Sequence, residues 1–134
     1  MNDTDLNNIV DEIENLPFLK YLELKIIHWK KGMCELFVPG TDKIINNAGE
    51  IRLGLCSIIS EACAYIAACT QADKERPPIT YSGKVTMISS FPQGGIYVYS
   101  DALGTQEDHL IESKIVDELG NLIALSTNRY FTSM

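Results

Sequence analysis

The most unusual residue of this sequence is a single glutamate inside a long apolar segment. Between Arg52 and Asp73 lie twenty residues, and Glu61 is the only one of them that is charged at neutral pH. A carboxylate held in apolar surroundings can act as a general base or as a nucleophile. The plainer alternative is a structural role, in which the carboxylate reaches water or pairs with a lysine or arginine. The residue types alone leave both roles open.

The neighbours of Glu61 indicate a groove. On a helical wheel Glu61 shares one stripe with small residues spaced three or four apart. The other members of the stripe are Gly54, Ser57, Ala64 and Ala68. A narrow groove along this stripe would place the carboxylate half-way down it. Small residues also allow close packing of a helix, so the pattern fits a structural role as well.

Other catalytic and metal-binding patterns are weak. The four cysteines lack Cys-x-x-Cys spacing and the two histidines are far apart, so we expect no metal site and no metal cofactor. We interpret the thiols as buried and reduced. The sequence contains no Gly-x-Ser-x-Gly nucleophile elbow and no glycine-rich phosphate loop, which argues against a serine hydrolase and a nucleotide cofactor. The cysteines are Cys34, Cys56, Cys63 and Cys69, and the histidines are His28 and His109.

Two helices follow from the periodicity of the chain. The apolar residues of segment 53–72 run all round the helical wheel, which predicts a helix of about 18 residues that is buried on every side. Because a charge at the centre of a membrane span costs roughly 2.5 kcal/mol or more, Glu61 argues against a transmembrane helix. Near the N-terminus, apolar residues from Leu6 to Ile13 have helical spacing, with Asp3 or Thr4 as N-cap and Pro17 as the stop. We expect a short amphipathic helix there.

Runs of β-branched and aromatic residues predict strands on both sides of the long helix. Two strands, Tyr21–His28 and Met33–Val38, form a hairpin before it, and four follow it: Ile79–Ile88, Ile96–Leu103, Leu110–Asp117 and Leu122–Phe131. The connections at 91–95, 104–108 and 118–121 have turn chemistry, so the last four strands form an antiparallel meander. The predicted fold class is α+β, with an antiparallel sheet of five or six strands around one long helix, in a single domain of residues 1–134.

Composition and charge limit the possible partners. The chain has 134 residues, 46% of them hydrophobic, and its 11 basic and 18 acidic side chains give a formal net charge of -7. Such an acidic balance argues against nucleic acid and against anionic membranes as partners. It does not exclude one small anionic ligand held by a local basic residue. The polar, acidic N-terminus has no signal-peptide pattern and favours a cytoplasmic location.

The loop before the long helix resembles that of hotdog-fold acyl-CoA thioesterases of the phenylacetate-pathway type. The motif of that family reads Asn, two residues, Gly, two residues, then His-Gly-Gly, with an acidic catalytic residue nine positions after the His. Asn46, Gly49 and Gly54 match this motif, and Glu61 falls at the acidic position without a gap. The resemblance extends over most of the chain, from 16–18 at its opening to 117–121 in its last hairpin.

This resemblance implies a hotdog fold and hydrolysis of acyl-CoA thioesters. In the family, a main-chain N–H at the start of the helix polarises the thioester carbonyl, which implies Leu53 and Gly54 as donors here and Glu61 as general base or nucleophile. Asn46 would position the loop, and further ligand contacts are expected at Gly49, Arg52 and Ser57. The family builds each site across a subunit interface, so a homodimer or a dimer of dimers is implied.

A hydroxyl on the strand after the helix supports the acidic residue, or its water, in this family. Counting back from Pro92 indicates Ser82, and counting forward from Glu61 indicates Thr80. Residues two apart on a regular strand face the same side, so we expect both hydroxyls to point the same way. Both remain candidates, beside the alternative that they are ordinary strand hydroxyls.

Two residues depart from the family motif. Arg52 stands where the family has His, and Leu53 stands where it has the first Gly. Leu53 keeps its N–H, but its Cβ can crowd a thioester. Arg52 would bind a phosphate or carboxylate at the helix N-terminus, or pair with Glu50 or Glu61. The alternatives to hydrolysis are therefore a non-catalytic hotdog protein that binds or senses an acyl-CoA or related ligand, and a purely structural oligomer module.

Overall fold

The computed structural model describes residues 1–103 and 109–132, so the predicted turn at 104–108 lies outside the described residues. Two helices and a hairpin precede the central helix, and four strands follow it. In chain order they are α1 (Asp3–Glu14), α2 (Pro17–Tyr21), β1 (Lys25–Lys30), β2 (Met33–Val38), α3 (Leu53–Cys69), β3 (Pro78–Met87), β4 (Ile96–Leu103), β5 (Leu110–Asp117) and β6 (Leu122–Thr132).

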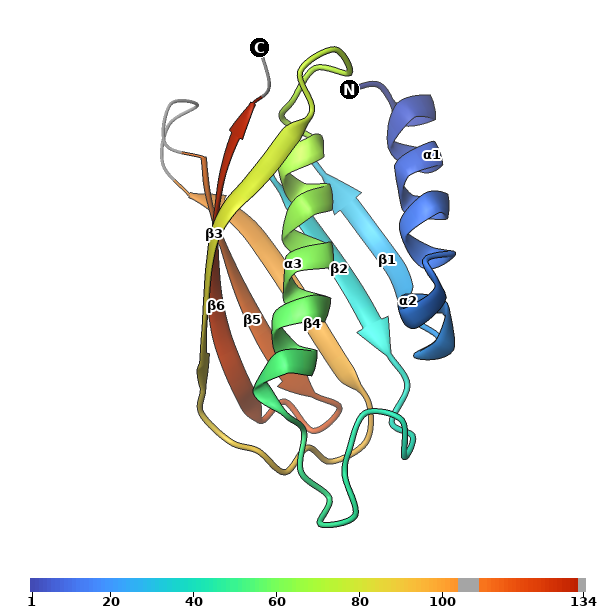
Figure 1. The fold of residues 1–134 in the computed structure, drawn as a ribbon, viewed down its shortest axis with the longest axis vertical. Coiled ribbons are helices and arrows are strands. Elements are labelled where there is room, and N and C mark those ends of the chain that lie inside the picture. The colour runs from blue at the N-terminus through green and yellow to red at the C-terminus, as the bar shows by residue number, and fades with distance from the viewer. Residues whose placement is uncertain (104–108, 133–134) are drawn as a thin grey trace.

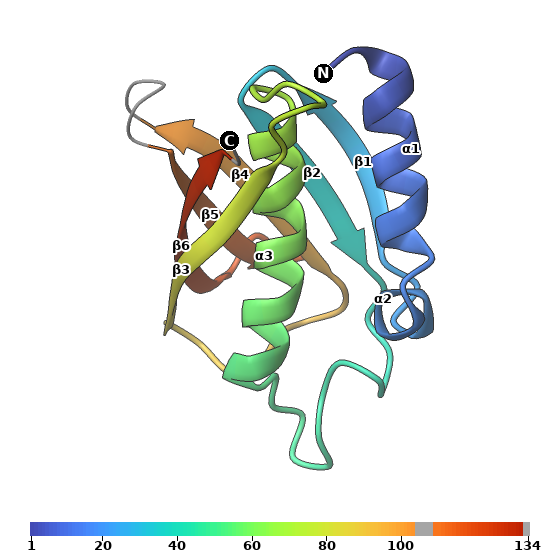
Figure 2. The same cartoon turned by 45° about the horizontal axis from the view of Figure 1, so that its top comes forward.

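The six strands form one antiparallel sheet in the order β1-β2-β4-β5-β6-β3. The sheet curves around α3, which crosses one of its faces, and α1 lies beside α3 on the same face (Figures 1 and 2). The predicted α+β class, with an antiparallel sheet wrapped around one long helix and a short N-terminal helix, is confirmed. Strands β1 and β3 are the two edges of the sheet, and β3 lies next to the last strand, β6.

Helix α3 fills the curved face of the sheet and supplies much of the core. Its side chains Ile59 and Ile66 are fully buried, and the helix contacts all six strands. The prediction that it is buried on every side is wrong for its outward face, where Leu53 is 53% and Ile58 is 45% exposed. The sheet covers one side of α3, and helix α1 covers part of another. In a single chain the outward face with Leu53 and Ile58 therefore stays in contact with water.

Helix α1 begins as predicted but with a different cap. Asn2, and not Asp3 or Thr4, is the N-cap, and its side chain accepts the N–H of Asp5 at 2.8 Å. An Asn side chain at the cap satisfies one of the N–H groups that the first turn leaves without a helical acceptor.

Pro17 follows the end of α1 and begins a second helix. Pro17 is the first residue of α2, a position where its fixed φ favours the helix. Tyr21 therefore belongs to α2, and the strand predicted from Tyr21 begins only at Lys25. The turn between them uses Glu23 at φ 61°. The short α2 matters because it places Leu16 and Phe18 beside α3.

The interior holds the four cysteines, which are buried and unpaired. The Cys63 thiol donates to the carbonyl oxygens of Cys34 and Val98, at 3.4 and 3.6 Å. In residues 1–103 and 109–132, no group of three or more metal-binding side chains comes together. No helix of this described part is long and apolar enough to cross a membrane.

Candidate functional site

Glu61 lies half-buried on α3, at the level of the edge strand β3. The hydroxyl of Thr80 on β3 donates a hydrogen bond of 2.9 Å to Glu61 Oε1. In the described part of the chain, this is the hydrogen bond that fixes the Glu61 carboxylate. No lysine or arginine of the described residues forms an ion pair with it, so the salt-bridge alternative for Glu61 does not apply to the single chain.

An irregularity in β3 separates the two candidate hydroxyls. Thr80 pairs with Tyr130 on β6, whereas Ser82 pairs with the adjacent residue Arg129, so Tyr81 is an extra residue in β3. Adjacent residues of β6 face opposite sides, and such a bulge therefore turns Ser82 away from the side that Thr80 faces. The expectation that both hydroxyls point the same way is wrong for this reason. Thr80 is the hydroxyl that reaches Glu61.

Tyr130 joins this cluster from the neighbouring strand. It pairs with Thr80 across the β3–β6 ladder and its side chain is 3% exposed. Burial, followed by the negative charge of Glu61, raises the pKa of the Tyr130 phenol above its ordinary value. The phenol therefore stays neutral beside the carboxylate. The sequence alone did not indicate Tyr130, because its approach to Thr80 depends on the register of a bulged strand pair.

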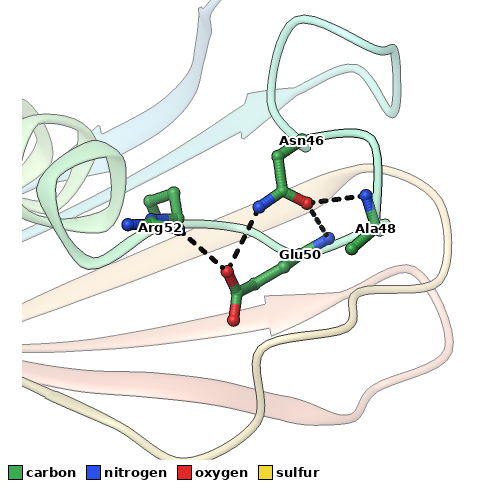
Figure 3. Close-up of polar contacts among 4 residues, drawn as sticks. All are labelled: Asn46, Ala48, Glu50 and Arg52. Carbon is green, nitrogen blue, oxygen red and sulfur yellow. Dashed lines mark hydrogen bonds and ion pairs between the residues drawn. The ribbon is translucent and has the colours of Figure 1, made fainter.

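The loop before α3 is closed by the side chain of Asn46 (Figure 3). Asn46 Oδ1 accepts the N–H groups of Ala48 and Glu50, each at 3.0 Å, and its Nδ2 donates to Glu50 Oε1 at 3.2 Å. Gly49 has φ +82°, a conformation that side chains rarely adopt, and its N–H bonds to the Asn46 carbonyl at 2.9 Å. Asn46 and Gly49 thus shape a tight turn before α3.

Arg52 pairs with Glu50 in this loop (Figure 3). The distance from Arg52 Nη1 to Glu50 Oε1 is 3.3 Å, while the Arg52 side chain is 74% exposed. An exposed pair of this kind contributes little to stability. The guanidinium is consequently held loosely, beside the first turn of α3. Of the two predicted partners, Glu50 is the one that the structure supports.

The first turn of α3 has free main-chain donors. Arg52 is its N-cap but makes no side-chain capping bond, and the first helical bond runs from the Cys56 N–H to the Arg52 carbonyl at 3.2 Å. The N–H groups of Leu53 and Gly54 therefore have no acceptor within the helix. Space around a Cβ at Gly54 is open, and the Leu53 side chain is exposed. A carbonyl oxygen approaching this turn would meet two unused donors.

The predicted residues form two groups that one chain does not bring together. Leu53 and Glu61 are eight residues apart on one helix, which separates them by about 12 Å along its axis. The loop group contains Asn46, Gly49, Arg52, Leu53 and Gly54, and the carboxylate group contains Glu61 and Thr80. Ser57 lies between the two groups on an exposed part of α3, one turn before Glu61. Ser82 belongs to neither.

A groove of about 660 Å³ runs between the N-terminal helices and α3, and Glu61 is in its wall. We call it the α1–α3 groove. Most of its lining is apolar, and the α3 side consists of Ile58, Ala62 and Tyr65 beside Glu61. The groove therefore lies on the neighbouring face of α3 and not along the small-residue stripe, where the sequence predicted it. Ala64 and Ala68 of that stripe are buried, at 0% and 8% exposure, and neither lines the α1–α3 groove.

Two further residues of the groove carry polar groups. Glu12, on α1, is the second carboxylate of the lining, and Tyr65 brings a phenol. Burial raises the pKa of Tyr65 to about 12, with smaller effects from Cys69, Glu12 and Glu61. Among the described residues, the groove is thus lined by acidic and neutral groups and by no basic side chain. Sequence reasoning missed Glu12 and Tyr65, because only the packing of α1 against α3 makes them face one another.

A curved antiparallel sheet wrapped around one long helix is the arrangement of the hotdog fold. Solved structures of thioesterases match the chain at the level of this fold. It is similar to a thioesterase family protein from Silicibacter pomeroyi, with a TM-score of 0.84 and 16% identity over 96% of this chain and 98% of that one. It is also similar to a thioesterase from Staphylococcus aureus, with a TM-score of 0.81 and 18% identity over 89% of this chain and 100% of the other.

A thioesterase from Haemophilus influenzae is a third such structure, with a TM-score of 0.80 and 13% identity over 95% of this chain and 90% of that one. Neither a family model nor a curated protein matches the sequence. The resemblance drawn from the loop at 46–54 is thus confirmed at the level of the fold. At such low identities the shared fold does not carry a substrate with it.

Proposed function

We propose that this protein hydrolyses acyl-CoA thioesters to a free acid and CoA. The observation that supports this most directly is the position of Glu61, fixed by Thr80, in the wall of an apolar groove. Small-molecule sites are typically apolar hollows of about 300–1,000 Å³ with a few polar groups, and the α1–α3 groove has this character. The fold neighbours that are named as thioesterases favour the same reaction class.

In the proposed reaction, Glu61 removes a proton from water and the resulting hydroxide attacks the thioester carbonyl carbon. The carbonyl oxygen becomes an oxyanion, which accepts hydrogen bonds from the N–H groups of Leu53 and Gly54. Collapse of the tetrahedral intermediate breaks the C–S bond and releases CoA as the thiolate, which takes up the proton that Glu61 removed from water and so restores the carboxylate. Glu61 could instead attack the carbonyl directly and form an anhydride that water then hydrolyses. Thr80 orients the carboxylate in either route.

The separation of the two groups of residues supports a homodimer. A general base and the oxyanion donors must each lie about 3 Å from the reacting atoms, and an axial separation of about 12 Å along one helix is too large for this. We therefore propose that a second copy of the chain supplies Leu53 and Gly54 to the Glu61 of the first. A dimer, or a dimer of dimers, would complete the site.

Strand β3 is the edge that we propose for this contact. It is ten residues long and has an unpaired side, and such edges are usually covered. Exposed apolar side chains accompany it, with Tyr81 at 59% and Phe131 of the adjacent β6 at 47% exposure. Pairing two copies along β3 would cover these side chains and bring a second α3 close to the Glu61 face.

The remaining loop residues are proposed to contact the ligand. The Arg52 guanidinium is loosely paired, so it is free to exchange Glu50 for a phosphate of CoA. Gly49 has open space where a side chain would be, and Ser57 is exposed one turn before Glu61. A protein with a net charge of -7 needs such a local cation to hold an anionic ligand.

A second candidate function is binding of an acyl-CoA, or a related ligand, without turnover. The observation that favours it is the Leu53 side chain, which stands exposed on the turn where the family has glycine. If this side chain keeps the thioester away from the two N–H groups, the oxyanion loses its donors. The groove would then bind the ligand and report it, as a sensor does.

The experiment that distinguishes these functions measures thiol release from a panel of acyl-CoAs. We expect release by the purified protein and a loss of about a hundredfold or more in Glu61→Gln, the usual scale of general-base catalysis. Glu75→Gln, which changes an exposed carboxylate outside the groove, is the matched control. Saturable binding without release would favour the sensor, and neither binding nor release would contradict both functions.

A further inference from the structure

A second hollow continues the α1–α3 groove toward the N-terminus. We call it the far hollow; it has a volume of about 200 Å³ and is lined by α1, Tyr65 and the segment after α3, with Asp5, Ile9 and Lys74 among its residues. Of the described residues, Tyr65 alone lines both the groove and the far hollow. The phenol ring therefore stands at the boundary between them.

The two hollows lie along one line on the molecule. On α1, Asp5 and Ile9 line the far hollow, and Glu12 and Ile13 line the groove. These residues are spaced by three or four and so occupy one face of the helix. On α3, Glu61 and Tyr65 are one turn apart on the face opposite. Helices α1 and α3 lie side by side (Figures 1 and 2), and both line the groove and the far hollow, which share Tyr65.

We propose that Tyr65 is the end wall of the acyl site and that it limits the substrate to uncharged, apolar acyl groups of short to medium length. This inference rests on the proposed function, because it takes the acyl group of a thioester as the occupant of the α1–α3 groove. Tyr65 acts here as a specificity-determining residue and takes no part in the bond-breaking step.

The direction of the acyl chain follows from exposure. Toward α2 the groove is bordered by Leu16, Phe18 and Ile58, all between 45% and 48% exposed, and by the buried Leu19, so the larger exposed apolar surface lies at this end. Toward Tyr65 it is bordered by Ile13 and Ala62, which are 8% and 5% exposed, and by the exposed Glu12. An apolar chain loses more contact with water at the buried end. From a thioester at Glu61 the chain would thus run toward Tyr65, which stands about 6 Å further along α3.

The charge of the lining defines the chemistry of the acyl group. Glu12 and Glu61 are the carboxylates of the lining, and no lysine, arginine or histidine in the described part of the chain lines the groove. An acyl group that ends in a carboxylate would meet like charge in partly desolvated surroundings, which is unfavourable. We therefore expect hydrocarbon acyl-CoAs to be accepted and dicarboxylic acyl-CoAs of equal length to be rejected.

The test compares Tyr65→Ala with the unchanged protein on straight-chain acyl-CoAs of increasing length. In the unchanged protein kcat/KM should rise by about fourfold for each methylene that is buried, and stop rising when the chain reaches the ring. In Tyr65→Ala the rise should continue for at least two more carbons, a relative gain on the order of tenfold for the longer substrates. An optimum that stays at the same length in a folded Tyr65→Ala protein would overturn the proposal.

Matched variants distinguish the effect of the Tyr65 ring from a general loosening of the packing between α1 and α3. Tyr65→Phe keeps the ring and should keep the optimum. Ile9→Ala enlarges the far hollow behind the intact ring and should also keep it. A shift of equal size in either variant would contradict the assignment of the wall to the Tyr65 ring. If Tyr65→Ala does not fold, Tyr65→Leu removes the ring with a smaller loss of packing and takes its place.

A binding measurement separates this inference from the proposed hydrolysis. Titration calorimetry of the same acyl-CoAs is carried out on Glu61→Gln and on Glu61→Gln combined with Tyr65→Ala. Suppose that the unchanged protein releases no thiol but the double variant binds longer acyl-CoAs about tenfold more tightly than the single variant. The proposed hydrolysis is then contradicted, and the role of Tyr65 as the end wall of the acyl site is supported. If the protein hydrolyses acyl-CoAs but Tyr65→Ala changes the chain-length dependence of neither activity nor affinity, the proposed function is supported and the role of Tyr65 as end wall is contradicted.

Discussion

Thr80 and Glu61 are joined across the interface between β3 and α3 by a hydrogen bond of 2.9 Å, donated by the threonine hydroxyl. The bond depends on an irregularity in β3, because the extra residue Tyr81 leaves Thr80 on the helix side of the sheet and turns Ser82 to the other side. One irregular strand position thus selects which of two nearby hydroxyls serves the carboxylate.

The first prediction concerns this hydroxyl. Thr80→Val keeps the shape of the side chain but removes the donor, and a hydrogen bond to a charged group contributes about 1.5–3 kcal/mol. We expect kcat to fall by about tenfold to a hundredfold, with a smaller change in KM, because Glu61 loses its orientation. Initial rates of thiol release from an acyl-CoA give both constants.

Two substitutions serve as comparisons for Thr80→Val. Thr80→Ser restores a hydroxyl at the same position and should recover most of the rate. Ser82→Ala removes the hydroxyl that faces away and should leave the rate within about twofold, a difference of roughly 0.4 kcal/mol. A larger loss in Ser82→Ala than in Thr80→Val would mean that the hydroxyl of Ser82 supports Glu61 in the working protein.

A second prediction concerns the loop before α3. Gly49 has φ +82° and open space around a Cβ, so Gly49→Ala tests the backbone conformation without a steric clash. An L-residue in the left-handed region costs about 1–2 kcal/mol, and we expect a loss of stability of that size. Gly54→Ala has equal space but a helical backbone, and should stabilise by a few tenths of a kcal/mol. Urea unfolding of both variants checks this, and equal effects would contradict it.

A third prediction is a pH-dependent contribution to stability from Asp117, the last residue of β5. This carboxylate is 2% exposed and accepts the backbone N–H groups of Gln93, Leu119 and Asn121 and the Asn121 side-chain amide. Burial alone would raise the pKa of Asp117, but these bonds, with that of Gln93 foremost, outweigh burial and hold the pKa below its ordinary 3.8.

Because the folded pKa of Asp117 is lowered, its stabilisation is complete above the ordinary pKa and is lost as the pH falls through the folded value. We expect Asp117→Asn to lower the free energy of unfolding by about 1–2 kcal/mol at pH 7. The gap between the two proteins should narrow below about pH 4. Urea unfolding of both at pH 7, 5 and 3 measures it, and a gap that widens in acid would contradict the sign.

A fourth prediction concerns the unpaired edge of β3. Tyr81 is 59% exposed and its ring lies 5.7 Å from that of Phe131, so Tyr81→Lys places a charge in this apolar patch. If two copies pair along β3, the light-scattering mass should fall from that of a dimer to that of one chain. Thiol release should fall with it, because each Glu61 would lose the donors of the second copy.

The opposite edge of the sheet provides the control for Tyr81→Lys. Ile27 on β1 is 49% exposed, and Ile27→Lys introduces the same charge on the other edge strand. We expect it to leave both mass and rate unchanged. A single-chain mass for the unchanged protein would count against a site shared between subunits.

Several parts of the fold and site could be predicted from the sequence because they depend on neighbours along the chain. The long apolar run defined α3, and alternating residues defined most strands. The Asn46 turn and the position of Glu61 nine residues after Arg52 could also be predicted, because the loop and the helix follow each other without a break in the chain. Errors arose where a proline began a second helix, and where Asn2 rather than its neighbours capped α1.

Other features required the three-dimensional structure, because they depend on contacts between segments far apart in sequence. The position of the groove depends on the packing of α1 against α3 and on the residues that α2 adds to the lining, which place it at Ile58, Ala62 and Tyr65 and not at the small-residue stripe. The choice of Thr80 and the approach of Tyr130 depend on a strand register that one extra residue shifts. Sequence periodicity assumes a regular strand, so it does not predict such a shift.

The long helix, its single carboxylate and the preceding loop could be predicted because each is set by local spacing and backbone preference. The surroundings of the carboxylate come from the packing of separate elements: the Thr80 hydroxyl from β3 and the apolar groove beside α1, with Tyr65 in its lining. The physical reason is that a side chain's neighbours across a fold depend on how separate elements pack, and many packings are compatible with the same periodicity.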